Sequence, residues 1–217
     1  YNLYPHLQYG TFLANHDQNR IMNSFGFDEN KVKLAASIYL TLPGIPYLYY
    51  GEEIGMSGVK PDEDIRRPMQ WDGTRHAGFT SGTPWRAVQS GYPTYNVTKE
   101  QTDANSLLTT YKKLIHLRNK EKALQIGTYV PIPTDDNRVF AFLREYEGET
   151  VLVMHNTNTS TIRDIELTID NSSLAAGNWT LLDRLAADAA VNTKLDNGKM
   201  QFDLTLDGRG TKVYKFA

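Results

Sequence analysis

The sequence contains no cysteine, which excludes disulfide bonds and zinc sites built on thiolate ligands. No apolar run is long enough to cross a membrane as a helix, which takes about 20 residues. An excess of one charge is also lacking, because 23 Lys and Arg stand against 25 Asp and Glu, for a formal net charge of -2. Nucleic acids and anionic membranes are therefore poor candidate partners.

The composition is that of a globular protein with one or two domains: 217 residues, 40% hydrophobic and 22% charged. Aromatic residues make up 11% of the chain and include 13 Tyr. This content suits the recognition of sugars through aromatic faces and hydrogen bonds, and it equally suits an ordinary hydrophobic core.

The first part of the chain reads as strand, helix and strand. Residues 9–14 and 45–50 are apolar runs typical of buried strands. Between them, Asp28 can cap a helix with a broad apolar face, which Pro43 and Gly44 end. A strand–helix–strand order requires a parallel sheet.

Residues 51–104 form a long connection whose aromatic residues predict an ordered loop. A helix is expected over residues 106–120, capped by Asn105 or Asp103. After residue 122 the pattern changes to short alternating segments separated by Asn-Gly and Asp-Gly turns, typical of antiparallel strands. We expect strands over 126–132, 138–144, 150–155, 161–168, 178–183, 200–205 and 211–216.

Three motifs follow one another in the chain. Thr11–Asp17 places an apolar strand directly before Asn-His-Asp, Gly44–Glu53 ends a strand in a Gly-Glu turn, and Arg66–Asp72 carries Arg-x-Pro-Met-Gln-Trp. Together they resemble the α-amylase family of retaining glycoside hydrolases, in the branch near bacterial α-amylases and oligo-1,6-glucosidases. The first two resemble the seventh and eighth strands of that family's (β/α)8 barrel.

The resemblance implies a fold of two parts. Residues 1–122 would hold strands 7 and 8 of a TIM barrel, helices 7 and 8, and the long loop that follows strand 8. Residues 123–217 would form an antiparallel β-sandwich. Catalytic groups of such barrels lie at the carboxyl ends of the strands, which is where Asp17 stands.

By the same resemblance, Asp17 is the third catalytic carboxylate, which stabilises the transition state by accepting hydrogen bonds from sugar hydroxyls. The alternative reading is that Asp17 caps the following turn. His16 would bind the same sugar ring, or else be a structural histidine. Arg66 would lie near the first sugar subsite. Arg20 is a further substrate-binding candidate that pairs with a carboxylate near the site, or else an exposed surface residue.

Glu52 and Glu53 look like an acid/base pair, but the resemblance assigns them to the turn that closes the barrel. Asp62, Glu63 and Asp64 lack the spacing of a calcium loop and read as an acidic, solvated turn. We expect no metal site and no cofactor in this chain. Relatives often bind calcium, through residues of an upstream part.

The family's nucleophile motif, Gly-x-Arg-x-Asp, is missing, and no candidate acid/base stands elsewhere. We therefore expect the C-terminal portion of an α-amylase that cleaves α-1,4-glucosidic bonds in starch or maltooligosaccharides, inactive alone and partnered by the N-terminal part of the same enzyme. The alternatives are an α-glucosidase, an oligo-1,6-glucosidase or a transglycosylating relative. From another class, a non-catalytic carbohydrate-binding or transporter-associated homologue remains. A secreted or cell-surface bacterial location is expected.

Overall fold

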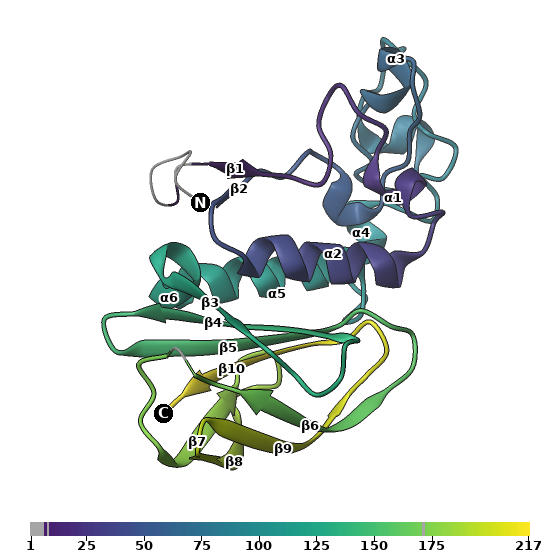
Figure 1. Cartoon of the computed structure of the whole chain (residues 1–217). Coiled ribbons are helices and arrows are strands. Elements are labelled where there is room, and N and C mark those ends of the chain that lie inside the picture. Colours follow the sequence, from purple (N-terminus) through teal and green to yellow (C-terminus); the bar gives the residue numbers. More distant parts are fainter. Residues whose placement is uncertain (1–6, 8, 171) are drawn as a thin grey trace. The chain divides into compact units, whose positions relative to one another are not determined.

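The computed structural model describes residue 7, residues 9–170 and residues 172–217. The chain divides into two compact units. We call residues 9–39 and 45–115 the loop-rich unit, and residues 40–44 and 116–217 the β-rich unit (Figure 1). The longer segment of the β-rich unit begins at residue 116. The predicted domain boundary between residues 122 and 123 stays a prediction.

The loop-rich unit contains a pair of parallel strands, β1 (Gly10–Thr11) and β2 (Ile45–Pro46). Ile45 N–H donates to the Tyr9 carbonyl at 2.9 Å and Tyr47 N–H to the Thr11 carbonyl at 2.7 Å. The predicted parallel pairing is confirmed, as a partial barrel-like sheet. Each strand is two residues long, shorter than predicted, because each has one partner strand among the described residues.

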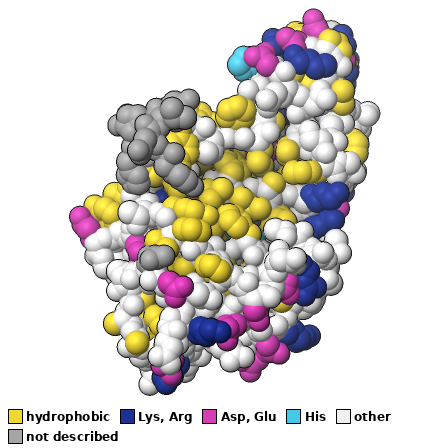
Figure 2. Space-filling view, viewed as in Figure 1, with side chains coloured by type: hydrophobic (Ala, Val, Ile, Leu, Met, Phe, Trp, Pro, Cys, Tyr) yellow, Lys and Arg dark blue, Asp and Glu magenta, His cyan; other side chains and the backbone are white. Residues whose placement is uncertain are grey.

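Large hydrophobic side chains around this strand pair are exposed. Phe12 is 47% exposed and Tyr47 is 60% exposed, whereas parallel strands are normally covered on both faces. Figure 2 shows a broad area of hydrophobic side chains on the viewed face of the molecule. The exposed residues close to β1 and β2 in sequence are Tyr9, Phe12, Ile45, Tyr47, Leu48 and Tyr50.

The main helices are α2 (Glu29–Thr41) and α5 (Leu107–Lys120). Asp28 caps α2 as predicted, because its Oδ1 accepts from Lys31 N–H at 3.2 Å. The prediction of Asn105 or Asp103 as the cap of α5 was wrong: Ser106 Oγ accepts from Thr109 N–H at 3.0 Å. In the loop-rich unit, α1 (Ile21–Ser24), α2 and α5 contribute to a core that includes Met22, Val32 and Leu107.

The long connection is ordered, as predicted. Its short elements are η1 (Glu52–Ile54), α3 (Asp62–Ile65), η2 (Arg75–Gly78) and α4 (Val97–Glu100). Gln70 is buried and its side-chain amide donates to the Tyr95 carbonyl. The Trp71 carbonyl accepts from Thr98 N–H at 2.9 Å, which fastens one side of the connection to the first turn of α4.

The β-rich unit holds one eight-stranded antiparallel sheet in the described residues, in the order β3-β4-β5-β10-β7-β8-β9-β6. The antiparallel pattern was predicted, but the described strands form one continuous sheet, so the predicted β-sandwich is not confirmed, and β8 was missed. The short helix α6 (Lys122–Ile126) leads into it. The strands are β3 (Thr128–Ile132), β4 (Val139–Tyr146), β5 (Glu149–Asn156), β6 (Ile162–Thr168), β7 (Gly177–Asp183), β8 (Ala189–Asp196), β9 (Lys199–Leu206) and β10 (Thr211–Phe216).

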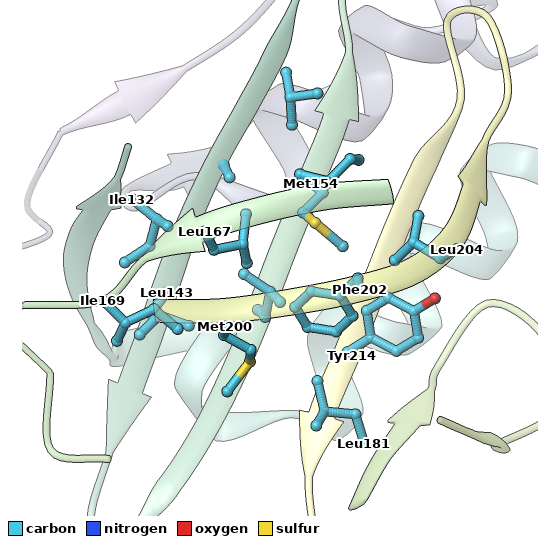
Figure 3. Close-up of a cluster of buried hydrophobic side chains, with 14 of the residues drawn as sticks. Ile132, Leu143, Met154, Leu167, Ile169, Leu181, Met200, Phe202, Leu204 and Tyr214 are labelled. Atoms are coloured by element: carbon cyan, nitrogen blue, oxygen red, sulfur yellow. The ribbon is translucent and has the colours of Figure 1, made fainter. Parts of the chain in front are cut away.

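Both faces of this sheet are covered near its centre. On one face, Leu143, Leu167 and Phe202 belong to a large hydrophobic cluster (Figure 3). On the other face, Phe142 and Val153 pack with side chains that include Leu117, Ala123 and Leu124. Neighbouring residues of a strand point to opposite faces, so Phe142 and Leu143 enter different clusters. This explains why β5 is buried over nearly its whole length.

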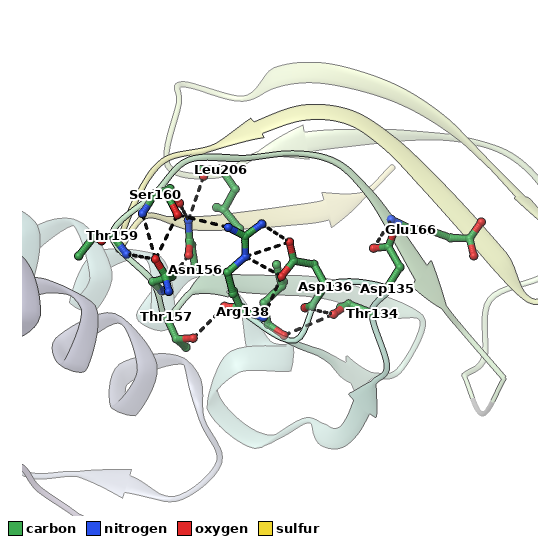
Figure 4. Close-up of polar contacts among 12 residues, drawn as sticks. Thr134, Asp135, Asp136, Arg138, Asn156, Thr157, Thr159, Ser160, Glu166 and Leu206 are labelled. Atoms are coloured by element: carbon green, nitrogen blue, oxygen red, sulfur yellow. Dashed lines mark hydrogen bonds and ion pairs between the residues drawn. The ribbon is translucent and has the colours of Figure 1, made fainter.

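The first and last strands of the sheet are joined by backbone contacts. Thr134 forms a bridge with Leu167, and Asp135 N–H donates to the Glu166 carbonyl at 3.2 Å. Figure 4 shows this region and the neighbouring pair of Arg138 and Asp136, in which Arg138 Nε donates to Asp136 Oδ1 at 2.9 Å. The sheet therefore folds back so that its two ends meet.

Two buried arginines hold residues 40–44 in the β-rich unit. Arg118 donates to the carbonyls of Leu40, Leu42 and Gly44 at 2.7–2.9 Å. Arg144, which is fully buried, donates to the Thr41 carbonyl at 2.7 Å. The carbonyls at the end of a helix lack partners within the helix, and these side chains supply donors. Within the described residues, no helix is both long and apolar enough to span a bilayer.

His155 lies at the centre of the sheet and is fully buried. Its Nδ1 lies 2.9 Å from Thr211 Oγ1, its Nε2 lies 3.4 Å from Thr41 Oγ1, and Phe140 stacks on its ring. Burial lowers the pKa of His155 from 6.5 to about 3, because the charged imidazolium would lose its hydration.

This pKa predicts a loss of stability in acid. The imidazole of His155 binds a proton more tightly in the unfolded chain than in the folded protein. The stability that depends on a neutral His155 is therefore fully present above pH 6.5 and is lost as the pH falls toward 3. At pH 4.5 the loss is about 2–3 kcal/mol. Denaturant unfolding of the wild type and of His155→Gln at pH 7 and pH 4.5 measures it. The variant should lose less stability between the two pH values, and an equal loss in both proteins contradicts the prediction.

Candidate functional site

Three of the predicted site residues come together in the loop-rich unit. Arg66 Nη2 donates to Asp17 Oδ1 at 2.9 Å, and Arg66 Nε donates to the His16 carbonyl at 2.8 Å. His16 Nε2 lies 3.3 Å from Asp17 Oδ2. Asp17 follows β1 and Arg66 follows α3, so the fold joins segments 49 residues apart.

The Asp17 carboxylate faces side chains and solvent. Among the described residues, its oxygens bond Arg66 and His16, and its side chain is 62% exposed. The turn that follows β1 is held instead by Asn15, whose Oδ1 accepts from Asp17 N–H at 2.9 Å. This geometry favours a carboxylate available to a ligand over one that caps the turn. An ionised carboxylate can accept several hydrogen bonds, and it therefore suits the hydroxyl groups of a sugar.

Arg66 also bonds a carboxylate that the sequence analysis assigned to a solvated turn, Asp62. Arg66 Nη2 donates to Asp62 Oδ2 at 2.7 Å, and Lys60 Nζ bonds the other Asp62 oxygen. The hydrogen bond from Lys60 and the nearby Arg66 charge lower the pKa of Asp62. The acidic stretch that reads as a solvated turn thus contributes one residue to the site. The available signal was the spacing of Asp62 and Arg66, which is that of an i,i+4 pair on a helix.

The neighbouring carboxylate, Asp64, holds the loop rather than the site. Its Oδ1 accepts from Arg67 Nη2 at 2.7 Å and from Arg86 Nη2 at 2.7 Å. Arg67 also donates to the Ala87 carbonyl at 2.8 Å. Arg67, with Asp64, therefore connects α3 to residues 86 and 87.

Arg20 lies in the interior, with 2% of the residue exposed. Its Nε donates to the Ile65 carbonyl at 2.9 Å and its Nη1 to the Tyr50 carbonyl at 2.6 Å. The guanidinium carbon stands 4.6 Å from the ring centres of both Tyr49 and Tyr50. The alternative of an exposed surface residue is wrong. The predicted contact with substrate stays a prediction that this burial disfavours, and the geometry favours a positioning role.

Glu52 and Glu53 are also interior groups. Glu52 is 3% exposed, its Oε1 accepts from Tyr111 Oη at 2.7 Å, and burial raises its pKa to about 7. Burial raises the pKa of Glu53 as well. Gly51, with φ of +79°, begins this turn and has no room for a Cβ against Met56. These observations agree with a structural turn rather than an acid/base pair at the site.

The described residues do not fit a metal site. They contain no group of three or more His, Asp or Glu side chains placed to bind an ion. His76 and His116 stand far apart in the sequence from each other and from the fully buried His155.

Comparison with known proteins identifies the family. Residues 4–127 match the model of the alpha amylase catalytic domain, which is more than half of the chain. The chain is 44% identical over 149 residues to "Alpha-amylase 3" of Dictyoglomus thermophilum, covering 68% of this chain and 30% of that protein. It is 36% identical over 185 residues to "Oligo-1,6-glucosidase" of Halalkalibacterium halodurans, covering 67% and 33%.

Solved structures agree with this result. The crystal structure of alpha-amylase from H. orenii matches with a TM-score of 0.76 and 38% identity, over 96% of this chain and 40% of that one. The fold and the matches relate the chain to a family of sugar-cleaving enzymes. It belongs to the α-amylase family of glycoside hydrolases, as the motifs predicted. It spans about a third of the length of the curated relatives it matches.

The burial of Arg20 gives a stability prediction. Arg20→Lys keeps the charge but removes the planar guanidinium that donates to two carbonyls. The free energy of unfolding should therefore fall by about 2–4 kcal/mol. Arg86→Lys is the matched control, because that side chain is 41% exposed and its ion pair should matter by at most about 1 kcal/mol. Denaturant unfolding of the full-length protein measures both. Similar small decreases in the free energy of unfolding of the two variants would show that the hydrogen bonds of Arg20 do not stabilise the fold.

Proposed function

We propose that this chain is the C-terminal portion of a retaining α-glucan hydrolase, an α-amylase that cleaves α-1,4-glucosidic bonds in starch or maltooligosaccharides. The observation that carries the proposal is the contact of Arg66 with Asp17 and His16, after the first strand of a parallel pair in an α-amylase-family fold. The 44% identity to a protein named alpha-amylase supports the choice of activity.

In the proposed reaction, the nucleophile and the acid/base belong to the upstream part, about 5–5.5 Å apart across the scissile bond. Asp17 accepts hydrogen bonds from hydroxyls of the distorted sugar ring. These bonds strengthen as positive charge develops on the ring, so Asp17 stabilises the transition state more than the ground state. His16 donates to the same ring, and Arg66 balances the carboxylate charge.

An oligo-1,6-glucosidase is the second candidate. The relative with that name is 36% identical and covers 67% of this chain, nearly the same share as the 68% covered by the named α-amylase. A substrate panel separates the two: soluble starch and maltoheptaose against isomaltose. Transglycosylating relatives give sugar-transfer products in the same panel. Proteins that bind sugar without cleaving it give no products, and the intact cluster of Asp17, His16 and Arg66 supports a catalytic site over such a role.

The proposed partner is the N-terminal part of the same enzyme, present as a second chain or as an upstream segment. The exposed hydrophobic side chains near β1 and β2, such as Phe12 and Tyr47, support it, because a parallel sheet is normally covered on both faces. Calcium, if the enzyme uses it, is assigned to that upstream part, and this chain is proposed to bind no cofactor. We also propose a secreted or cell-surface bacterial location, where polymeric starch is met.

The role of Asp17 predicts a large loss of turnover. Asp17→Asn in the full-length enzyme should lower kcat about 100- to 1,000-fold, because one preorganised charged acceptor at the transition state is lost. Asp196→Asn, at an exposed position of the β-rich unit, is the control and should leave kcat unchanged. Release of reducing ends from starch measures both. Retention of more than about a tenth of the wild-type kcat by Asp17→Asn would exclude the role.

A second prediction concerns the chain by itself. Residues 1–217 should release no reducing ends from starch, because the nucleophile and the acid/base are lacking. Addition of the separately produced upstream part should restore activity. Native mass spectrometry checks that the two parts associate. Starch hydrolysis by the isolated chain would contradict the proposal.

A further inference from the structure

We propose that Asp62 is a positioning residue for the glycosidase site: it holds part of Arg66 and so leaves part of the Asp17 carboxylate available to substrate. The inference rests on the proposed function. Asp62 lies outside the three motifs that define the family resemblance, and the proposed function gives it no role.

The geometry around Arg66 is that of a shared donor. One nitrogen, Nη2, donates to Asp17 Oδ1 at 2.9 Å and to Asp62 Oδ2 at 2.7 Å. The Nε donates to the His16 carbonyl at 2.8 Å. An arginine facing a single carboxylate commonly donates two parallel hydrogen bonds to it. Here Asp17 receives one, because the two hydrogens of Nη2 are divided between Asp17 and Asp62 and the Nε hydrogen goes to the His16 carbonyl.

Asp62 is itself held in place. It is the first residue of α3, and Lys60 Nζ bonds its Oδ1. The backbone N–H of Lys60 donates to Asn19 Oδ1 at 2.8 Å, and Asn19 stands two residues after Asp17. The segment that carries Asp62 is thus bonded to the segment that carries Asp17.

The consequence is a competition for the Asp17 oxygens. A sugar hydroxyl has to donate to an oxygen that Arg66 does not occupy. When Asp62 carries no charge, two guanidinium nitrogens of Arg66 can both donate to Asp17. The substrate then has to displace Arg66 from the Asp17 carboxylate. The groups are partly exposed, so the expected effect is small: KM rises roughly fivefold, while kcat stays within about twofold.

The experiment uses the full-length enzyme with three substitutions. Asp62→Asn removes the charge, Asp62→Glu keeps it, and Glu63→Gln removes the same charge from an exposed neighbour on the same helix. Steady-state kinetics on maltoheptaose and thermal unfolding are measured for each. A crystal structure of Asp62→Asn then shows where the Arg66 guanidinium lies.

The expected result is a higher KM for Asp62→Asn, near wild-type values for Asp62→Glu and Glu63→Gln, and two hydrogen bonds from Arg66 to Asp17 in the crystal. Equal KM values for Asp62→Asn and Glu63→Gln overturn the inference, as does an unmoved Arg66. Parallel losses of kcat and melting temperature also overturn it, in favour of a purely structural role. If the wild type cleaves no α-glucan, the proposed function fails, whereas the position of Arg66 still tests the shared-donor geometry.

Discussion

The geometry of the site depends on one buried cation, the guanidinium of Arg20. Removing this group from water is costly, and the carbonyls of Tyr50 and Ile65, together with two tyrosine rings, offset that cost. One carbonyl follows β2 and the other directly precedes Arg66. Arg20 itself stands three residues after Asp17. A single side chain therefore fixes three segments, and the contact between Asp17 and Arg66 follows from their spacing.

Part of the site was predictable because its residues lie inside recognisable motifs. Asp17, His16 and Arg66 were expected together, and they are in contact. Asp62 was not found, because a run of acidic residues on a loop is most often solvated and its partners are set by the fold. The interior position of Arg20 was also missed. Arginine is almost never fully buried unless it is paired, and its pairing with carbonyls leaves no pattern in a sequence.

The fold shows the same division. A strand with strong alternation, β9, was located from the sequence. The strand β8 was missed because, of its eight residues, Leu195 alone is buried. Its structure comes from pairing with β7 along the whole strand, a tertiary effect that alternation does not reveal. The lengths of β1 and β2 were overestimated, since strand length depends on neighbouring strands as well as on the residues of the strand.

The position of β10 has a consequence for biosynthesis. The strand formed by residues 211–216 lies between β5 and β7, in the middle of the sheet, although it is the last of these eight strands to leave the ribosome. Until it emerges, β5 and β7 each keep an open edge, and the buried histidine lacks Thr211. The β-rich unit is thus completed after translation of its final strand. A chain that stops before residue 211 is left with two half-sheets, β3-β4-β5 and β7-β8-β9-β6, whose open strand edges favour aggregation.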